Sequence, residues 1–341
     1  MRKTRTNKYI NYASYCLLCA SIIASVSVNA AEKSQSLPVK NTVEIKFLVD
    51  DDKNSVVRAT ALKFKELISK QVSANHMKVV VESLGDRDLF EEMRVGNAQM
   101  IAPKLSRLKR YSKRLQVFEL PFIFYSGKAA RNFLDGEWGD RLLHSLKQQN
   151  VDAHGYIHQG MKHLTSDTPI SLPEDASDKA MGIFYSNTSK QYFEDIGSEI
   201  VALNDTEENS ALSNGRVNIT ENNWSRIYNQ NIFNEHKYVL ESNHTYTGNV
   251  LISSPGLLDQ MPAKLLPIIE KAIKDSIEYG NEYASKKINS YRNIVLNSGS
   301  NIVQELAARD RYLWIEEANK IWSQYEDDIG LQLINAAASH R

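Results

Sequence analysis

Cationic side chains are concentrated in residues 104–114, where six of the eleven positions are lysine or arginine: Lys104, Arg107, Lys109, Arg110, Lys113 and Arg114. A run of this density can bind nucleic acid or anionic lipid, or it can be the solvated face of a helix. A third interpretation is that its first residues follow the end of a strand and project into a cleft that attracts small anions. The location of the protein and the elements around the run decide among the three.

Other residues that could do chemistry are few. His154 and His158 share a face at helical or strand spacing and could pair on a metal, but no third ligand lies near them, which favours two surface or cleft histidines. The acidic clusters 207–208 and 326–328 are typical of helix ends or solvated charge. The motifs of serine hydrolases, P-loop enzymes, dinucleotide-binding enzymes and zinc proteases are absent from the sequence. We therefore expect no enzyme activity, no metal and no cofactor.

The elements that must position these residues alternate between strand and helix. Strands are predicted at 43–49, 77–81 and 98–102, and helices at 55–72 and 86–95. This alternation predicts an α/β layer in which helices cover a largely parallel sheet. Ligands of such sheets bind beyond the carboxyl ends of the strands, so the loops after Val49, Val81 and Ala102 are candidate positions.

A second run of elements begins near Val151. Residues 151–157 read as a strand leading into 160–165, followed by a loop at 169–178, a strand at 180–185 and a helix through Phe193. Residues 207–214 look helical and end at Gly215, a plausible left-handed cap. A helical period then persists from 262 to 297, which predicts a helix long enough to run along two lobes.

The first 30 residues have the pattern of an export signal. Four cationic residues precede an uncharged apolar stretch that ends in small residues, and we expect cleavage after Ala30. A membrane anchor and a lipoprotein signal are the alternatives, but the stretch is Ser-rich and short for a span, and Cys19 lies inside it rather than at its end. Cys16 and Cys19 leave with the signal, so the mature chain has no thiol chemistry.

The composition is that of a globular protein. The chain has 341 residues, of which 42% are hydrophobic and 24% charged, with 41 Lys and Arg against 41 Asp and Glu. Loss of the four cations in the signal leaves 37 against 41, so the exported protein is acidic. Balanced charge argues against a nucleic-acid-binding protein. The length favours two lobes.

Six motifs in a fixed order make the chain resemble the DctP family, the periplasmic solute-binding subunits of TRAP transporters. They are Gly85-Asp-Arg87, Glu92-Met-Arg-Val-Gly96, Ile101-Ala-Pro103, the stretch 115–124, Gly160-Met-Lys-His-Leu-Thr165 and the stretch 215–228. Asn243-His244 also falls where the family has such a pair. The match covers nearly the whole mature chain, and among subgroups it is most similar to the C4-dicarboxylate binders.

The resemblance implies an α/β, two-lobed periplasmic binding protein of type II-like fold with a long helix spanning both lobes. We expect a signal peptide at 1–30, lobe I at 31–159 and 248–287, and lobe II at 160–247 and 288–341. The implied function is periplasmic capture of a small carboxylate, of the C4-dicarboxylate kind, and its delivery to the TRAP membrane permease. The implied partners are that ligand and the permease subunits, with no nucleic acid and a monomeric state.

The sequence departs from the family at the arginine that clamps the substrate carboxylate, because Gly182 stands at that position. We therefore expect Lys162 to neutralise the carboxylate and Asn222 to hydrogen-bond it. Lys104 and Arg107 are expected to add positive potential and Trp224 to wall the pocket. Asp86, in the loop after the second strand, is a further candidate.

Two other functions stay open. A ligand-sensing or degenerate binding module of the same fold, signalling to a membrane receptor, is motivated by Gly182. An exported hydrolase is the third possibility, and the missing nucleophile motif argues against it.

Overall fold

The structure, a computed structural model, describes residues 42–50, 52–85, 87–184, 186–204 and 207–340. The signal-peptide prediction for 1–30 and the candidate Asp86 lie outside these residues. No helix within the described ranges has the length and apolar character needed to cross a membrane.

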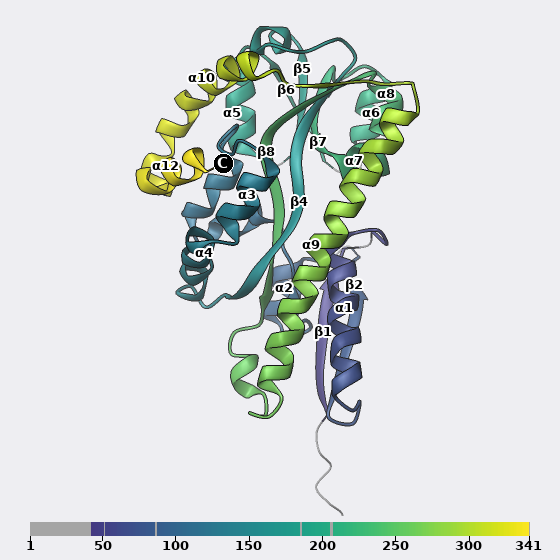
Figure 1. The fold of residues 1–341 in the computed structure, drawn as a ribbon, viewed down its shortest axis with the longest axis vertical. Coiled ribbons are helices and arrows are strands. Elements are labelled where there is room, and N and C mark those ends of the chain that lie inside the picture. Colours follow the sequence, from purple (N-terminus) through teal and green to yellow (C-terminus); the bar gives the residue numbers. More distant parts are fainter. Residues whose placement is uncertain (1–41, 51, 86, 185, 205–206, 341) are drawn as a thin grey trace, which may run out of the picture. The chain divides into compact units, whose positions relative to one another are not determined.

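The described strands form one mixed sheet of nine (Figure 1). Their order is β2 (Met77–Ser83), β1 (Val43–Val49), β3 (Met100–Ile101), β8 (Tyr238–Ser253), β4 (Asp152–Ser166), β7 (Ile219–Asn223), β5 (Ala180–Ile183) and β6 (Glu199–Ala202), with β9 (Ile302–Glu305) paired to β8. The long strands β4 and β8 form the middle of the sheet, and each end of their ladder carries its own group of shorter strands.

The prediction of a largely parallel sheet is correct at the two ends and wrong in the middle. β1 pairs in parallel with β2 and β3, and β5 with β6 and β7, whereas β8 is antiparallel to both β3 and β4, and β4 is antiparallel to β7. The sequence carries no local signal for β8, because its segment mixes polar and apolar residues and nearly all of them are buried. Strict alternation identifies a strand only when one face is exposed to water.

Helices cover the sheet. They are α1 (Val56–Gln71), α2 (Leu89–Arg94), α3 (Gly127–Leu134), α4 (Glu137–Lys147), α5 (Asn187–Asp195), α6 (Glu208–Ser213), α7 (Trp224–Asn229), α8 (Ile232–Glu235), α9 (Leu266–Asn297), α10 (Ala308–Gln324), α11 (Glu326–Ile329) and α12 (Leu331–Ser339). Four 3₁₀ helices join them: η1 (Leu105–Arg110), η2 (Lys113–Glu119), η3 (Pro173–Ala176) and η4 (Leu258–Gln260). The predicted strand at 43–49 and the helices predicted at 55–72 and 207–214 are confirmed within two residues at each end.

The predicted long helix is confirmed as α9, the green helix beside β4 in Figure 1. It packs on α1 near its start, on β4 along its middle and on α7 toward its end. Gly280 permits the close approach to α1, because a Cβ there would lie 2.0 Å from Oγ1 of the buried Thr60. α9 therefore braces both ends of the sheet.

The ladder of β4 and β8 is irregular near its centre. The register shifts between His158 and Gly160, and Gly160 has a φ of +88° and faces Thr247 of β8. A Cβ on Gly160 would lie 2.9 Å from Cδ1 of Ile288 on α9. The β-bulge thus lies where both long strands and the long helix come together.

Candidate functional site

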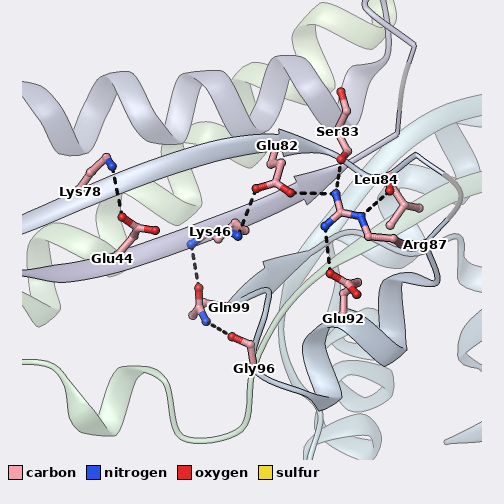
Figure 2. A network of polar contacts seen from close by, with 10 residues as sticks. All are labelled: Glu44, Lys46, Lys78, Glu82, Ser83, Leu84, Arg87, Glu92, Gly96 and Gln99. Atoms are coloured by element: carbon pink, nitrogen blue, oxygen red, sulfur yellow. Dashed lines mark hydrogen bonds and ion pairs between the residues drawn. The ribbon is translucent and has the colours of Figure 1, made fainter.

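An ion-pair network joins the end of β2 to α2 (Figure 2). Arg87 pairs with Glu82 at 2.9 Å and with Glu92 of α2 at 3.0 Å, and its Nε donates to the carbonyl of Leu84 at 2.8 Å. Lys46 of β1 joins the same Glu82 at 3.2 Å. Because Arg87 binds both strand and helix, it holds the carboxyl end of β2 against α2.

The network extends to the loop before β3. The backbone N–H of Lys46 donates to Oε1 of Gln99 at 2.9 Å, and Nε2 of Gln99 donates to the carbonyl of Gly96 at 2.9 Å (Figure 2). These contacts link β1, β2, α2 and the segment before β3 to one another.

Most cations of residues 104–114 form ion pairs or ring contacts within the molecule. Arg107 pairs with Asp88 at 2.6 Å and lies over the ring of Phe90, and Lys113 pairs with Asp328 at 2.7 Å. Arg110 also lies over Phe90, with its guanidinium carbon 4.2 Å from the ring centroid. Arg107 therefore has an internal partner, Asp88.

A buried ion pair lies at the ladder between β4 and β7. Nζ of Lys162 donates to Oε1 of Glu221 at 2.5 Å, and the side chain of Lys162 is 17% exposed while that of Glu221 is fully buried. Oε2 of Glu221 accepts from Nε2 of His244 at 3.0 Å. Because the ionised Glu221 can only accept, Nε2 of the neutral His244 carries the proton, and Nδ1 accepts from Oγ of Ser242 at 2.7 Å.

Charge and burial oppose each other in this pair. Burial alone raises the pKa of Glu221, but the charge of Lys162 and the hydrogen bond from His244 outweigh it and lower the pKa to about 2. Burial lowers the pKa of His244 against the opposing effect of Glu221, so the imidazole is neutral at pH 7. The pair is therefore ionised, and its lysine keeps one edge toward solvent.

A second glutamate, Glu119 of η2, is affected by the charge of Lys162. Oε2 of Glu119 accepts from Nζ of Lys109 at 3.4 Å, and Oε1 is buried with no hydrogen-bond partner among the described residues. Burial raises the pKa of Glu119, while Lys109, Lys162 and the hydroxyl of Ser186 act against that rise. Lys109, Glu119, Lys162, Glu221 and His244 together are called the lysine cluster below.

The residues in and around the lysine cluster come from segments at both ends of the sheet. Lys109 and Glu119 lie on the 3₁₀ helices that follow β3, Lys162 is on β4, and Ser186 caps α5 directly after β5. Positions beyond the carboxyl ends of parallel strands are the usual ligand sites of α/β sheets. The arrangement can bind an anion through the partly exposed ammonium group of Lys162.

Asn222 belongs to a different cluster. Its Nδ2 donates to Oε1 of Glu208 at 2.8 Å and to Oγ1 of Thr220 at 3.1 Å, and Arg226 pairs with Oε2 of Glu208 at 2.5 Å. The guanidinium carbon of Arg226 lies 4.5 Å from the ring centroid of Phe184. Glu208 is buried, so an internal carboxylate already accepts from both the amide and the guanidinium.

The pleat separates Lys162 from Asn222. Lys162 lies opposite Asn223 and Leu164 opposite Glu221, whereas Asn222 lies opposite His163. Residues directly opposite in an antiparallel ladder share a face, and successive residues alternate between faces. Lys162 with Glu221 and Asn222 with Glu208 therefore lie on opposite faces of this ladder.

The structure does not bring the other described candidates to either cluster. Trp224 is 2% exposed and donates from Nε1 to Glu241 at 3.1 Å. Lys104 is exposed in the loop after β3, where it forms a β-bridge with Asn249, and Arg107 faces Asp88. At Gly182 a Cβ would lie 2.6 Å from Cδ1 of Leu203 and 3.0 Å from Cγ2 of Thr220, so no space is left there for a larger side chain without rearrangement.

Five residues of the two clusters were not among the site residues predicted from the sequence: Glu119, Glu208, Glu221, Arg226 and His244. A carboxylate in the middle of a five-residue strand, as Glu221 is, was the available signal, because a buried charge requires a partner. The partners themselves come from distant segments, which no local pattern identifies.

The two histidines considered as metal ligands have other partners. Nε2 of His154 lies 2.8 Å from Oγ of Ser253, and Nδ1 of His158 bonds the hydroxyl of Tyr246. Across the described part of the chain, no group of three or more His, Cys, Asp or Glu side chains could hold a metal ion.

Residues 50–328 match the model of the family described as bacterial extracellular solute-binding protein, family 7 (DctP). A C4-dicarboxylate-binding periplasmic protein DctP from Shewanella loihica is 30% identical over 327 residues, which cover 95% of this chain and 97% of the relative. The corresponding protein of Vibrio cholerae is 26% identical and covers 94% of this chain and 96% of the relative.

Solved structures agree with the sequence relatives. A TRAP periplasmic solute-binding protein from Shewanella oneidensis with bound succinate has a TM-score of 0.79 and 31% identity, covering 87% of this chain and 99% of its own. One from Pseudomonas aeruginosa with bound L-malate has a TM-score of 0.74 and 27% identity, covering 83% and 100%.

Proposed function

Because the chain belongs to bacterial extracellular solute-binding protein family 7, we propose that it captures a small carboxylate of the C4-dicarboxylate type in the periplasm and delivers it to the membrane permease of a TRAP transporter. The family consists of binding proteins, not enzymes. The succinate and L-malate in the similar structures support a short dicarboxylate as ligand.

The single observation that carries the proposal is the position of Lys162. Its side chain is 17% exposed and is held by a fully buried carboxylate, and its charge acts on Glu119 in η2, which follows β3. An ammonium group anchored in this way has further N–H donors for a ligand carboxylate. Removal of water on ligand binding strengthens each such bond.

We also propose the two-lobed division, with lobe I at 31–159 and 248–287 and lobe II at 160–247 and 288–341. The three boundaries within the described residues are neighbours, since Gly160 faces Thr247 and approaches Ile288. A bulge with a glycine at positive φ is a position where a ladder can bend. We propose that the ladder bends at Gly160 and that this bending closes the lobes around the ligand.

The periplasmic location and the monomeric state are part of the proposal. The N-terminal pattern supports export, and cleavage after Ala30 would give a mature chain beginning at Ala31. Mass spectrometry of the protein secreted to the periplasm of a bacterial host, together with its mass in solution by light scattering, tests both points.

Thermal unfolding with a panel of dicarboxylates, monocarboxylates, sugar acids and zwitterions tests the ligand. A ligand at a hundred times its Kd adds about 2.7 kcal/mol to the free energy of unfolding. We expect stabilisation by succinate or malate, and a flat panel contradicts the proposal. Lys162→Gln combined with Glu221→Gln removes the cation without leaving a buried charge unpaired, and should abolish that stabilisation.

A sensing role is the second candidate, favoured by one observation. The carboxylate of Glu208 accepts from the amide of Asn222 and pairs with the guanidinium of Arg226. An internal carboxylate therefore already binds these two groups. A flat panel together with function in a strain lacking the permease supports this candidate instead.

A further inference from the structure

Glu119 is a buried carboxyl group whose hydrogen bonds are incomplete. Its side chain is 7% exposed, Oε2 accepts from Lys109 at the long distance of 3.4 Å, and Oε1 has no partner among the described residues. A buried carboxylate normally accepts several hydrogen bonds, because each unsatisfied oxygen costs desolvation energy. The ionised group is therefore only weakly stabilised, and a ligand that draws on one of its cations would leave it without compensation.

The charged and polar groups that act on Glu119 come from several elements, including the hydroxyl of Ser186 at the start of α5. Lys109 faces it from η1 and Lys162 acts on it from β4, with Glu221 of β7 and the neutral His244 of β8 behind Lys162. On the exposed side of η2, Lys113 and Asp328 of α11 compensate each other. With both glutamates ionised, the two lysines are fully neutralised and the lysine cluster has no charge left for an anion.

We propose that Glu119 is a further specificity-determining residue of the carboxylate site, and that it holds a proton when one ligand carboxylate is bound. The inference rests on the proposed function. Protonation of Glu119 gives the lysine cluster a net charge of +1, which matches one carboxylate. The proton comes from solvent, and no covalent bond forms or breaks in the ligand. Burial, which raises the pKa of Glu119, favours the same state.

The proposal predicts proton uptake on binding. Titration calorimetry of succinate into the full mature protein, in buffers of different ionisation enthalpy between pH 7 and 9, measures the number of protons taken up. In this range the succinate itself is fully ionised, since carboxylic acids titrate well below pH 7. We expect about one proton for the unchanged protein and an affinity that falls about tenfold per pH unit.

Glu119→Gln keeps the shape of the side chain and its neutral state. The variant should bind succinate with no proton uptake and with an affinity independent of pH from 7 to 9. Glu241→Gln is the matched control, because Glu241 is a buried carboxylate paired with Arg292 at 2.7 Å and lies outside the lysine cluster. It should keep the proton uptake of the unchanged protein.

The outcomes separate the two proposals. Succinate binding without proton uptake in the unchanged protein overturns the role of Glu119 and leaves the proposed function intact. Uptake that persists in Glu119→Gln overturns it as well. If no member of the carboxylate panel binds the unchanged protein, the proposed function fails, and this inference fails with it. Should Glu119→Gln not fold, Glu119→Asp replaces it: an acid at 119 should retain the uptake of one proton, and loss of uptake counts against the proposal.

Discussion

At the residue scale, the lysine proposed to bind the ligand is also part of the core. Lys162 neutralises Glu221, and breaking a buried ion pair by removing one partner is more costly than replacing both. A simple loss-of-binding variant at Lys162 therefore confounds ligand affinity with stability. The same logic applies to Asn222, whose amide bonds the buried Glu208.

Replacement of Lys162 alone should destabilise the protein by about 3 kcal/mol, since it leaves the carboxylate of Glu221 buried without its cation. The double variant Lys162→Gln with Glu221→Gln should recover at least half of this loss. Urea unfolding at pH 7 of the two single variants and the double variant measures the coupling. Additive losses would show that the pair contributes no specific interaction.

His163 gives a pH-dependent prediction. Burial lowers its pKa to about 4, so the folded protein holds it neutral while the unfolded chain binds a proton below about pH 6.5. Stability must therefore fall as the pH decreases from 6.5 toward 4. His163→Phe should reduce the stability difference between pH 7 and pH 5 by about 2 kcal/mol, measured by urea unfolding at both values.

His236 is expected to behave in the same way, because burial lowers its pKa to about 4 as well. An unchanged difference in His163→Phe would mean that the ring gains solvent access before it titrates.

At the scale of elements, α9 and α1 depend on one close contact. Gly280→Ala gains about 1 kcal/mol of helix propensity but places a Cβ against Oγ1 of Thr60, and both helices are fixed by the core behind them. Overpacking of this kind costs about 1–3 kcal/mol or more, so we expect a net loss of stability.

The companion variant Thr60→Ala makes room for the added methyl group. Gly280→Ala combined with Thr60→Ala should be more stable than Gly280→Ala alone in thermal or urea unfolding. If Gly280→Ala by itself stabilises the protein, the two helices can separate at little cost, and the bracing role of α9 must be revised.

At the scale of the whole described molecule, the proposed lobes share a core. One continuous hydrophobic cluster includes Leu48 and Phe118 from the first lobe and Met181, Phe193 and Trp314 from the second. β4, β8 and α9 also run through both. Units that share buried apolar surface in this way unfold together.

Calorimetry of the mature protein should therefore give one cooperative transition, and succinate should shift it as a whole. A van't Hoff enthalpy equal to the calorimetric enthalpy checks this point. Two resolved transitions, with only one moved by ligand, would contradict the shared core and would confine the site to one lobe.

The sequence by itself determined the local elements. Period-two alternation predicted β1, apolar residues at helical spacing predicted α1 and α9, and Gly215 marked the end of α6 at a φ of +70°. It also predicted a strand at 151–157 that leads into the segment of Lys162, although the structure continues this strand as β4 through Lys162 itself, and it identified the order of motifs that places the chain in its family. Each of these signals lies within a few turns of chain, so short-range physics is sufficient to read it.

Only the tertiary structure decided which side chains meet. The antiparallel pairing of β4 with β7 and β8 puts Lys162 beside Glu221 and turns Asn222 to the opposite face. A shift of one residue in register would exchange these faces, and the register depends on pairings between residues about 50 to 100 positions apart in the sequence. The partners of a buried charge come from the same long-range pairings, which is why Glu221, His244 and Glu119 emerged as a cluster only in three dimensions.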